Sequence, residues 1–180
     1  MQHNSKGFTL IEAMVVVLVA AILLAIAVPA WSSAMSAAHN GATRSTLAAT
    51  LLDAVSHSAV TGVEVVVCPY ADTAQCSGSI DWSGGWMAFA DLNGNRSRDP
   101  NETLVRRAEA LEGGVHLRST VGRTRLVFQP NGGNAGSNVT FTLCDGRGIE
   151  KATTLVLAND GRLRQGKPTA EAAQACVDGG

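Results

Sequence analysis

The apolar residues of this chain are concentrated near its N-terminus, in a segment long enough to be a membrane-spanning helix. Residues Phe8–Val28 read FTLIEAMVVVLVAAILLAIAV, and Glu12 is their only ionisable side chain. A helix of this length crosses a hydrocarbon core of about 30 Å. A carboxylate inside such a segment costs roughly 2.5–3.5 kcal/mol on insertion scales, so Glu12 is a candidate functional residue.

The helical pattern continues after Pro29 but becomes amphipathic. Leu47, Leu51 and Val55 recur at intervals of four and form one apolar stripe. No further proline interrupts the segment, so we predict a nearly continuous helix from about residue 8 to about residue 60. Its second half would form the spine of a globular domain.

From Gly62 onward the helical periodicity ends and short segments typical of β-strands begin. The short, β-branched segments are GVEVVVC, WMAFAD, TLVRRAE, VHLRS, TRLVFQ, NVTFTLC and TTLVLAND, separated by Gly, Asn, Asp or Pro. In NVTFTLC the apolar residues alternate with Thr140 and Thr142, which predicts one buried and one solvent-facing side. The predicted fold class is α+β, with a long N-terminal helix packed on antiparallel sheet.

Composition and charge limit the classes of function. The 180 residues are 46% apolar and carry a formal net charge of -1, which suits one membrane-anchored domain. A general coat for nucleic acid is excluded, and any contact with nucleic acid must come from a local cluster. The histidines lack metal-ligand spacing and no nucleophile motif is present, so we predict no enzyme, no metal and no cofactor.

The four cysteines, Cys68, Cys76, Cys144 and Cys176, indicate disulfides in an oxidising compartment. They are even in number, show no C-x-x-C spacing and have no histidine close enough for a zinc site. Three pairings are formally possible. We favour Cys68 with Cys76, which closes a short loop, and Cys144 with Cys176, which links the C-terminal segment to the rest of the domain.

The N-terminal pattern as a whole resembles the type IV prepilin signature. A polar leader ends in Gly7, Phe8 follows, and Thr9-Leu10-Ile11-Glu12 opens the apolar run. The resemblance implies cleavage between Gly7 and Phe8 by prepilin peptidase, methylation of the new Phe8 amine, and pairing of Glu12 with the N-terminus of a neighbouring subunit. A secretory signal cleaved within AWSSAMSA is the alternative, although such a signal has a shorter apolar region and no acid.

This resemblance also implies a domain organisation and a location. Residues 1–7 are expected to be a cleaved leader, residues 8–28 a transmembrane and assembly helix, and residues 29–180 a globular pilin domain. The chain would sit in the inner membrane with its C-terminal domain in the periplasm, and then join a fibre at the cell surface. Its expected partners are other major and minor pilins.

Four patches of the globular part resemble the minor pilins of the FimT and GspH type. They are VVVCPYADTAQC, DWSGGWMAFADLNGN, FTLCDGRG and ANDGRLR. Members of this group are minor subunits of type IV pili or minor pseudopilins of type II secretion systems. FimT-like pilins of transformable bacteria bind DNA through a C-terminal Gly-Arg-x-Arg motif, which Gly161, Arg162 and Arg164 match.

The chemistry of this motif is consistent with a phosphate ligand. Arginine donates bidentate, charge-assisted hydrogen bonds to phosphate, and an extended Arg162–Arg164 would place both guanidinium groups on one side. Lys167 adds a nearby charge, and Arg147 and Lys151 would extend the patch if their strand neighbours the C-terminal one. The alternative is an ordinary exposed hairpin on a structural pilin or pseudopilin that initiates assembly without binding DNA.

Two further patterns have structural interpretations that we prefer. Acidic and amide residues of ADLNGNRSRDPNE fall at calcium-loop positions, but Arg96 occupies the position that requires glycine, so a polar turn is favoured. The acidic and amide residues concerned are Asp91, Asn93, Asn95, Asp99 and Glu102. Trp82 and Trp86 are predicted to anchor the sheet beside the first disulfide and not to stack on bases.

Overall fold

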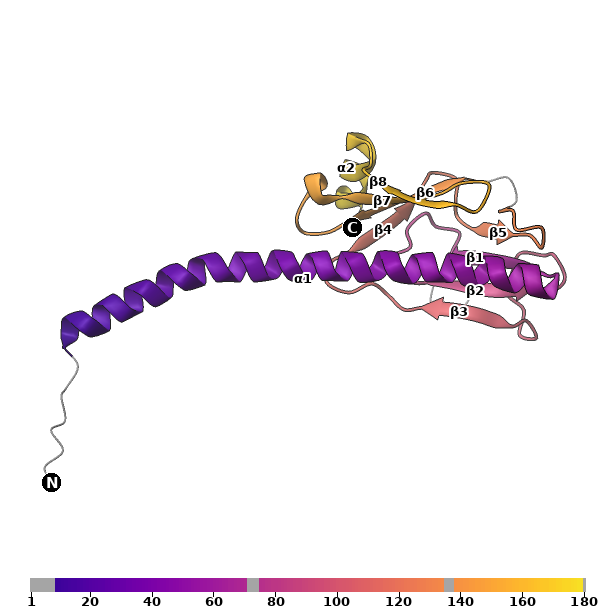
Figure 1. The fold of residues 1–180 in the computed structure, drawn as a ribbon. Helices are drawn as coiled ribbons and strands as arrows, with labels where there is room; N and C mark the ends of the chain where they lie inside the picture. Colours follow the sequence, from indigo (N-terminus) through magenta and orange to yellow (C-terminus); the bar gives the residue numbers. More distant parts are fainter. Residues whose placement is uncertain (1–8, 71–74, 135–137, 180) are drawn as a thin grey trace, which may run out of the picture. The chain divides into compact units, whose positions relative to one another are not determined.

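The structure is a computed structural model of the chain and describes residues 9–70, 75–134 and 138–179. Its helices are α1 (Leu10–Thr61), the 3-10 helix η1 (Ile149–Lys151) and α2 (Ala170–Asp178). Its strands are β1 (Glu64–Pro69), β2 (Trp86–Asp91), β3 (Leu104–Ala108), β4 (His116–Ser119), β5 (Leu126–Phe128), β6 (Val139–Cys144), β7 (Thr153–Leu157) and β8 (Leu163–Gly166). Figure 1 shows this order of elements along the chain.

Helix α1 confirms the predicted long helix and passes through Pro29 without ending. The chain divides into two compact units, residues Met1–Met35 and Ser36–Gly180. In α1, an 18-residue window has a mean hydropathy of 3.0 and is not buried in the protein. By length and composition, therefore, α1 can cross a membrane.

The second unit contains a complete core. The strands form two antiparallel four-stranded sheets, in the orders β3-β2-β1-β5 and β4-β6-β7-β8. Residues of α1 and of both sheets share one apolar cluster, which includes Leu47, Leu51, Val65, Trp86, Leu117, Phe141 and Leu155. Among the described residues, the buried core and both disulfides belong to Ser36–Gly180, so this segment has what it needs to fold without the N-terminal half of α1.

Trp82 and Trp86 are fully buried, as the prediction of sheet anchors requires. The Trp86 indole donates to the Thr50 hydroxyl on α1 at 3.1 Å. Trp82 donates to the Ser119 hydroxyl at 3.1 Å and meets the Phe141 ring edge to face, with centroids 4.9 Å apart. These polar tips are therefore satisfied inside the core, and neither ring is available to stack on a base.

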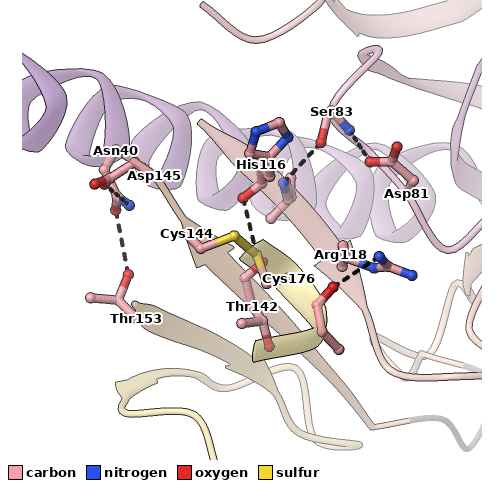
Figure 2. Close-up of a disulfide and its surroundings, with 12 residues drawn as sticks. Asn40, Asp81, Ser83, His116, Arg118, Thr142, Cys144, Asp145, Thr153 and Cys176 are labelled. Carbon is pink, nitrogen blue, oxygen red and sulfur yellow. Dashed lines mark hydrogen bonds between the residues drawn. A yellow bond between two sulfur atoms is a disulfide. The ribbon is translucent and has the colours of Figure 1, made fainter. Parts of the chain in front are cut away.

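Both favoured disulfides are present. Cys68 and Cys76 are bonded with their Cα atoms 5.6 Å apart, and Cys144 and Cys176 with theirs 6.0 Å apart. The second bond joins β6 to α2, a helix that the sequence analysis did not predict. Figure 2 shows Cys176 reaching from α2 to Cys144 at the end of its strand.

Helix α2 also changes the predicted pattern of β6. Val139, Phe141 and Leu143 are buried as expected, but Thr142, predicted to face solvent, is only 6% exposed. Because α2 contacts β6 and β4, it covers this part of the second sheet. We use the name outer face for the side of the second sheet that lies opposite the shared core and that α2 covers in part.

Candidate functional site

The Gly-Arg-x-Arg motif lies in the hairpin that joins β7 to β8. The Gly161 N–H donates to the Ala158 carbonyl at 3.0 Å, and the Ala158 N–H donates to the Arg162 carbonyl at 3.0 Å. This closes a three-residue loop of residues 159–161, in which Gly161 has a φ of 78°. Three-residue hairpin loops need a left-handed residue at this position, so the predicted Asp-Gly turn is confirmed.

Leu163 anchors the hairpin to the domain. It pairs with Leu157 across the two strands and packs against the shared core. The preceding loop adds support, because the Asn134 side chain donates to the Ala158 carbonyl at 3.3 Å. The packing of Leu163 and the hydrogen bond from Asn134 therefore both support the hairpin that carries the two arginines.

Arg162 is exposed but has an acidic neighbour. Its Nε donates to Asp160 Oδ2 at 2.6 Å, and its backbone N–H donates to Oδ1 at 3.2 Å. The backbone hydrogen bond first, and then the guanidinium, hold the pKa of the Asp160 carboxyl below its usual value. The Arg162 side chain is 81% exposed. Exposed pairs of this kind contribute little free energy, so a phosphate can compete for the guanidinium.

Arg164 is exposed on the outer face, where it pairs with Val156 of β7. Val156, Asn138 and Arg164 line a depression of about 340 Å³ at this end of the sheet. Within the residues that the structure describes, the Arg164 guanidinium forms no hydrogen bond and no ion pair. Its donors are therefore open to an incoming anion.

Arg147, which the sequence analysis placed in the same patch, has a structural role. Its Nε and Nη2 donate to the two carboxylate oxygens of Asp145 at 2.8 and 2.7 Å, and Asn40 of α1 donates to the same carboxylate at 3.0 Å. The Asp145 side chain is 1% exposed. Burial, the largest effect, raises the pKa of Asp145, but the hydrogen bonds from Arg147 and Asn40 outweigh it and lower that pKa.

The strand order corrects the predicted extension of the patch through Arg147 and Lys151. That extension required β6 to neighbour β8, but β7 lies between them. Lys151 is exposed at the end of η1, just before β7 begins, whereas the hairpin follows the other end of β7. Arg147 and Lys151 are therefore at the opposite end of the sheet from Arg162 and Arg164.

Lys167 lies at the end of β8 remote from the hairpin, since Gly166 pairs with Thr154 near the start of β7, but a continuous surface connects it with Arg164. It follows β8 directly and lines a depression of about 530 Å³ between the outer face and α2. Val156 lines this depression and also the one beside Arg164. The outer face thus connects Lys167 with Arg164.

The loop that resembles a calcium site is closed by its own backbone. Asp91 accepts from the N–H groups of Gly94 and Arg96, each at 2.9 Å. Glu102 accepts from those of Leu92 and Asp99 at 2.8 and 3.0 Å. Both carboxylates are buried. In the described parts of the chain, no three His, Cys, Asp or Glu residues form a metal-holding group. This geometry favours the polar turn.

The predicted N-terminal site is described only from residue 9 onward. Glu12 is exposed in the first turn of α1, and its N–H donates to the Thr9 hydroxyl at 3.3 Å. Gly7 and Phe8 lie outside the described residues. The structure therefore shows the Glu12 side chain exposed on α1.

Comparisons with known proteins cover both halves of the chain. Residues 43–161 match the family described as type II transport protein GspH, and residues 2–28 match the prokaryotic N-terminal methylation motif. The chain is 28% identical over 169 residues to the pilin-like protein PilA1 of Thermus thermophilus, covering 88% of this chain and 97% of that protein.

The fold is similar to two solved minor subunits. The type IV minor pilin FimU of Pseudomonas aeruginosa matches with a TM-score of 0.52 and 17% identity, over 69% of this chain and 89% of FimU. The minor pseudopilin EpsH from the type 2 secretion system of Vibrio cholerae matches with a TM-score of 0.52 and 13% identity, over 72% of this chain and 98% of EpsH. With the GspH match spanning most of its length, this chain belongs to the GspH family and is a minor type IV pilin or pseudopilin.

Proposed function

We propose that this minor pilin binds extracellular DNA through Arg162 and Arg164 and supports DNA uptake in natural transformation. One observation carries the proposal: two exposed arginines sit on a supported hairpin, and the guanidinium of Arg164 has no partner among the described residues. Since the hairpin is anchored through Leu163, little conformational entropy is lost when it binds. The GspH match ends at residue 161 and so does not itself cover these two arginines.

The expected mode of binding is contact with phosphate. The planar guanidinium group of arginine binds phosphate in a bidentate manner, and contacts with phosphate do not read the base sequence. Helix α2 is tied down by Cys176 and buries its Ala173 face, so it is not available to read bases in a groove. With two or three phosphates neutralised, the log-log salt slope on duplex DNA should be roughly -2 to -3. One subunit then binds weakly, and several subunits on a fibre gain avidity.

The test compares Ser36–Gly180 with its Arg162→Gln/Arg164→Gln variant in gel-shift titrations on a short duplex. We expect the double variant to bind at least about tenfold more weakly, a loss of about 1.4 kcal/mol, because two charge-assisted contacts are gone. The matched control is Lys151→Gln, which removes an exposed charge at the other end of the sheet. Equal affinity of the double variant and the parent, or no binding by either at low salt, would refute the proposal.

A second candidate function is a structural initiator of a pilus or pseudopilus that does not bind DNA. The ion pair between Arg162 and Asp160 favours it, since this arginine already has an anionic partner. So does the formal net charge of -1. In that case the gel shift fails at every salt concentration, while the assembly of fibres still depends on this subunit.

Both candidates share one mode of assembly, which we infer from the N-terminal motif. Prepilin peptidase cleaves between Gly7 and Phe8, the Phe8 amine is methylated, and α1 holds the subunit in the inner membrane before assembly. Glu12 then pairs with the N-terminal amine of a neighbouring subunit. In an apolar helix bundle this pairing offsets the cost of burying the carboxylate.

Glu12→Ala should reduce incorporation into fibres at least about tenfold, because a charge pair in the apolar bundle is lost while the neighbour's amine stays buried. Immunoblots of sheared fibres and of membranes measure the incorporation. Mass spectrometry should show normal cleavage after Gly7. Glu12→Asp keeps the charge and serves as the matched control. Normal incorporation of Glu12→Ala would contradict the pairing.

A further inference from the structure

The outer face of the second sheet carries a row of residues that crosses β8, β7 and β6 and ends at Thr120, which directly follows β4. The Thr120 N–H donates to the Thr140 carbonyl at 2.9 Å, Thr140 pairs with Val156, and Val156 pairs with Arg164. Thr120 and Arg164 are exposed, and Thr140 and Val156 are partly exposed. Because α2 covers the neighbouring Thr142 and Thr154, this row is the part of the outer face that remains accessible.

Three shallow depressions join along this row into one surface. Asn138 lines both the depression beside Arg164 and one of about 420 Å³ beside Arg123. Thr120 and Thr140 line this second depression and also the one that ends at Lys167. We call the joined surface the outer track.

The outer track concentrates positive charge. Its lining includes four cationic side chains, those of Arg118, Arg123, Arg164 and Lys167, and two carboxylates, those of Asp160 and Glu171. Asp160 is the partner of Arg162, so its charge is largely compensated. The whole chain, by contrast, has 14 basic and 15 acidic residues. The excess of positive charge is therefore local. A nearly neutral chain needs such a cluster to attract a polyanion.

Arg118 contributes charge to the outer track, but its guanidinium is hydrogen-bonded to α2. Its Nη1 donates to the Ala175 carbonyl at 3.0 Å, which ties β4 to the last turns of α2 (Figure 2). Arg123 stands beyond the end of β4, where its N–H donates to the Thr120 carbonyl at 2.9 Å. Arg123 and Arg164 thus lie near the two edge strands, which are three spacings of about 4.8 Å apart, or about 14 Å.

We propose that a DNA backbone crosses the second sheet along the outer track, with Arg164 and Arg123 binding phosphates at its two ends. This rests on the proposed function and adds a phosphate ligand at the β4 end of the sheet. Between the two arginines, the Thr140 hydroxyl and the Asn138 amide provide neutral hydrogen-bonding groups, and Val156 gives an apolar floor. The cations at the two edges of the sheet define the path of the DNA backbone across it.

The test measures the salt slope of Ser36–Gly180 on duplex and on single-stranded DNA. Each phosphate that the protein no longer neutralises makes the slope shallower by about 0.9 on duplex and by about 0.7 on a single strand. We expect Arg123→Gln to make the slope shallower by one such step and to weaken binding several-fold, whatever the DNA sequence. Arg123→Lys should keep the slope, because it keeps the charge. Lys151→Gln, at the far end of the sheet, should also leave the slope unchanged.

A second variant covers the case in which Arg123→Gln unfolds the domain, which thermal unfolding monitored by circular dichroism would reveal. Asn138→Asp places a carboxylate on the exposed middle of the outer track and should weaken binding with the fold intact. If Arg162→Gln/Arg164→Gln abolishes binding while Arg123→Gln and Asn138→Asp do not change it, the outer track is wrong and the proposed function stands. If the arginine pair has no effect, or the parent does not bind, both proposals fail.

Discussion

Replacing Cys144 and Cys176 together by serine is expected to lower the free energy of unfolding of Ser36–Gly180 by about 3.7 kcal/mol. The bond spans 32 residues, and a cross-link over a loop of this length restricts the unfolded chain by about that amount. Both sulfur atoms also lie in a buried cluster with Ala152 and Ala173, so their loss loosens α2. Denaturant titration of oxidised parent and variant measures the change.

The other disulfide provides the matched comparison. Cys68→Ser/Cys76→Ser removes a bond that spans 8 residues, for which the same relation gives about 2.5 kcal/mol. The two variants should therefore differ by about 1.2 kcal/mol, with the longer loop the more costly. Equal unfolding midpoints for the parent and the Cys144→Ser/Cys176→Ser variant would show that the C-terminal bond does not stabilise the domain.

Asp145→Ala should lower the free energy of unfolding by about 3 kcal/mol, at the low end of the range for a broken buried ion pair. It leaves Asn40, which is 3% exposed, without its carboxylate acceptor. The Arg147 side chain is 20% exposed and can reach water, so the loss stays below that for a fully buried cation. Asp145→Asn keeps the volume and one acceptor, and should lose about half as much.

The same carboxylate predicts a dependence on pH. Since the pKa of Asp145 is lower in the folded state than its ordinary value of about 3.9, the ionised form stabilises the fold above that value. This stability is lost as the pH falls through the lower, folded pKa. Unfolding curves of parent and Asp145→Asn should therefore converge below about pH 4. A difference that stays constant down to strongly acidic pH would contradict the ion pair.

Much of the fold could be predicted from the sequence because the signals are local. The four-residue spacing of Leu47, Leu51 and Val55 identified the helix, and short β-branched segments bounded by turn residues identified seven of the eight strands that the structure describes. The eighth strand, β8, contains only four residues, and just Leu163 among them is apolar. Periodicity cannot identify so short an element, although its turn chemistry was clear.

Helix α2 has a weak apolar pattern for a similar reason, although its sequence contains a helix-start signal. Its nine residues are mostly alanine and polar, so they give a weak apolar stripe. Thr169, however, caps the helix by accepting the Ala172 N–H at 3.2 Å, and Glu171 lies in the first turn. A threonine followed by an acid and a run of alanines is a helix start. Without α2, the alternation in β6 predicts a solvent-facing Thr142, although the helix covers it.

By itself, the sequence determined the long helix with its apolar first half, the antiparallel strands, the Gly161 turn and the arginines that follow it. Each of these depends on residues close together in the chain. Only the tertiary structure decided which charges share a surface, because that depends on strand order. With β7 between β6 and β8, Arg147 and Lys151 fall at the far end of the sheet, and Arg123, distant in sequence, lines the same continuous surface as Arg164.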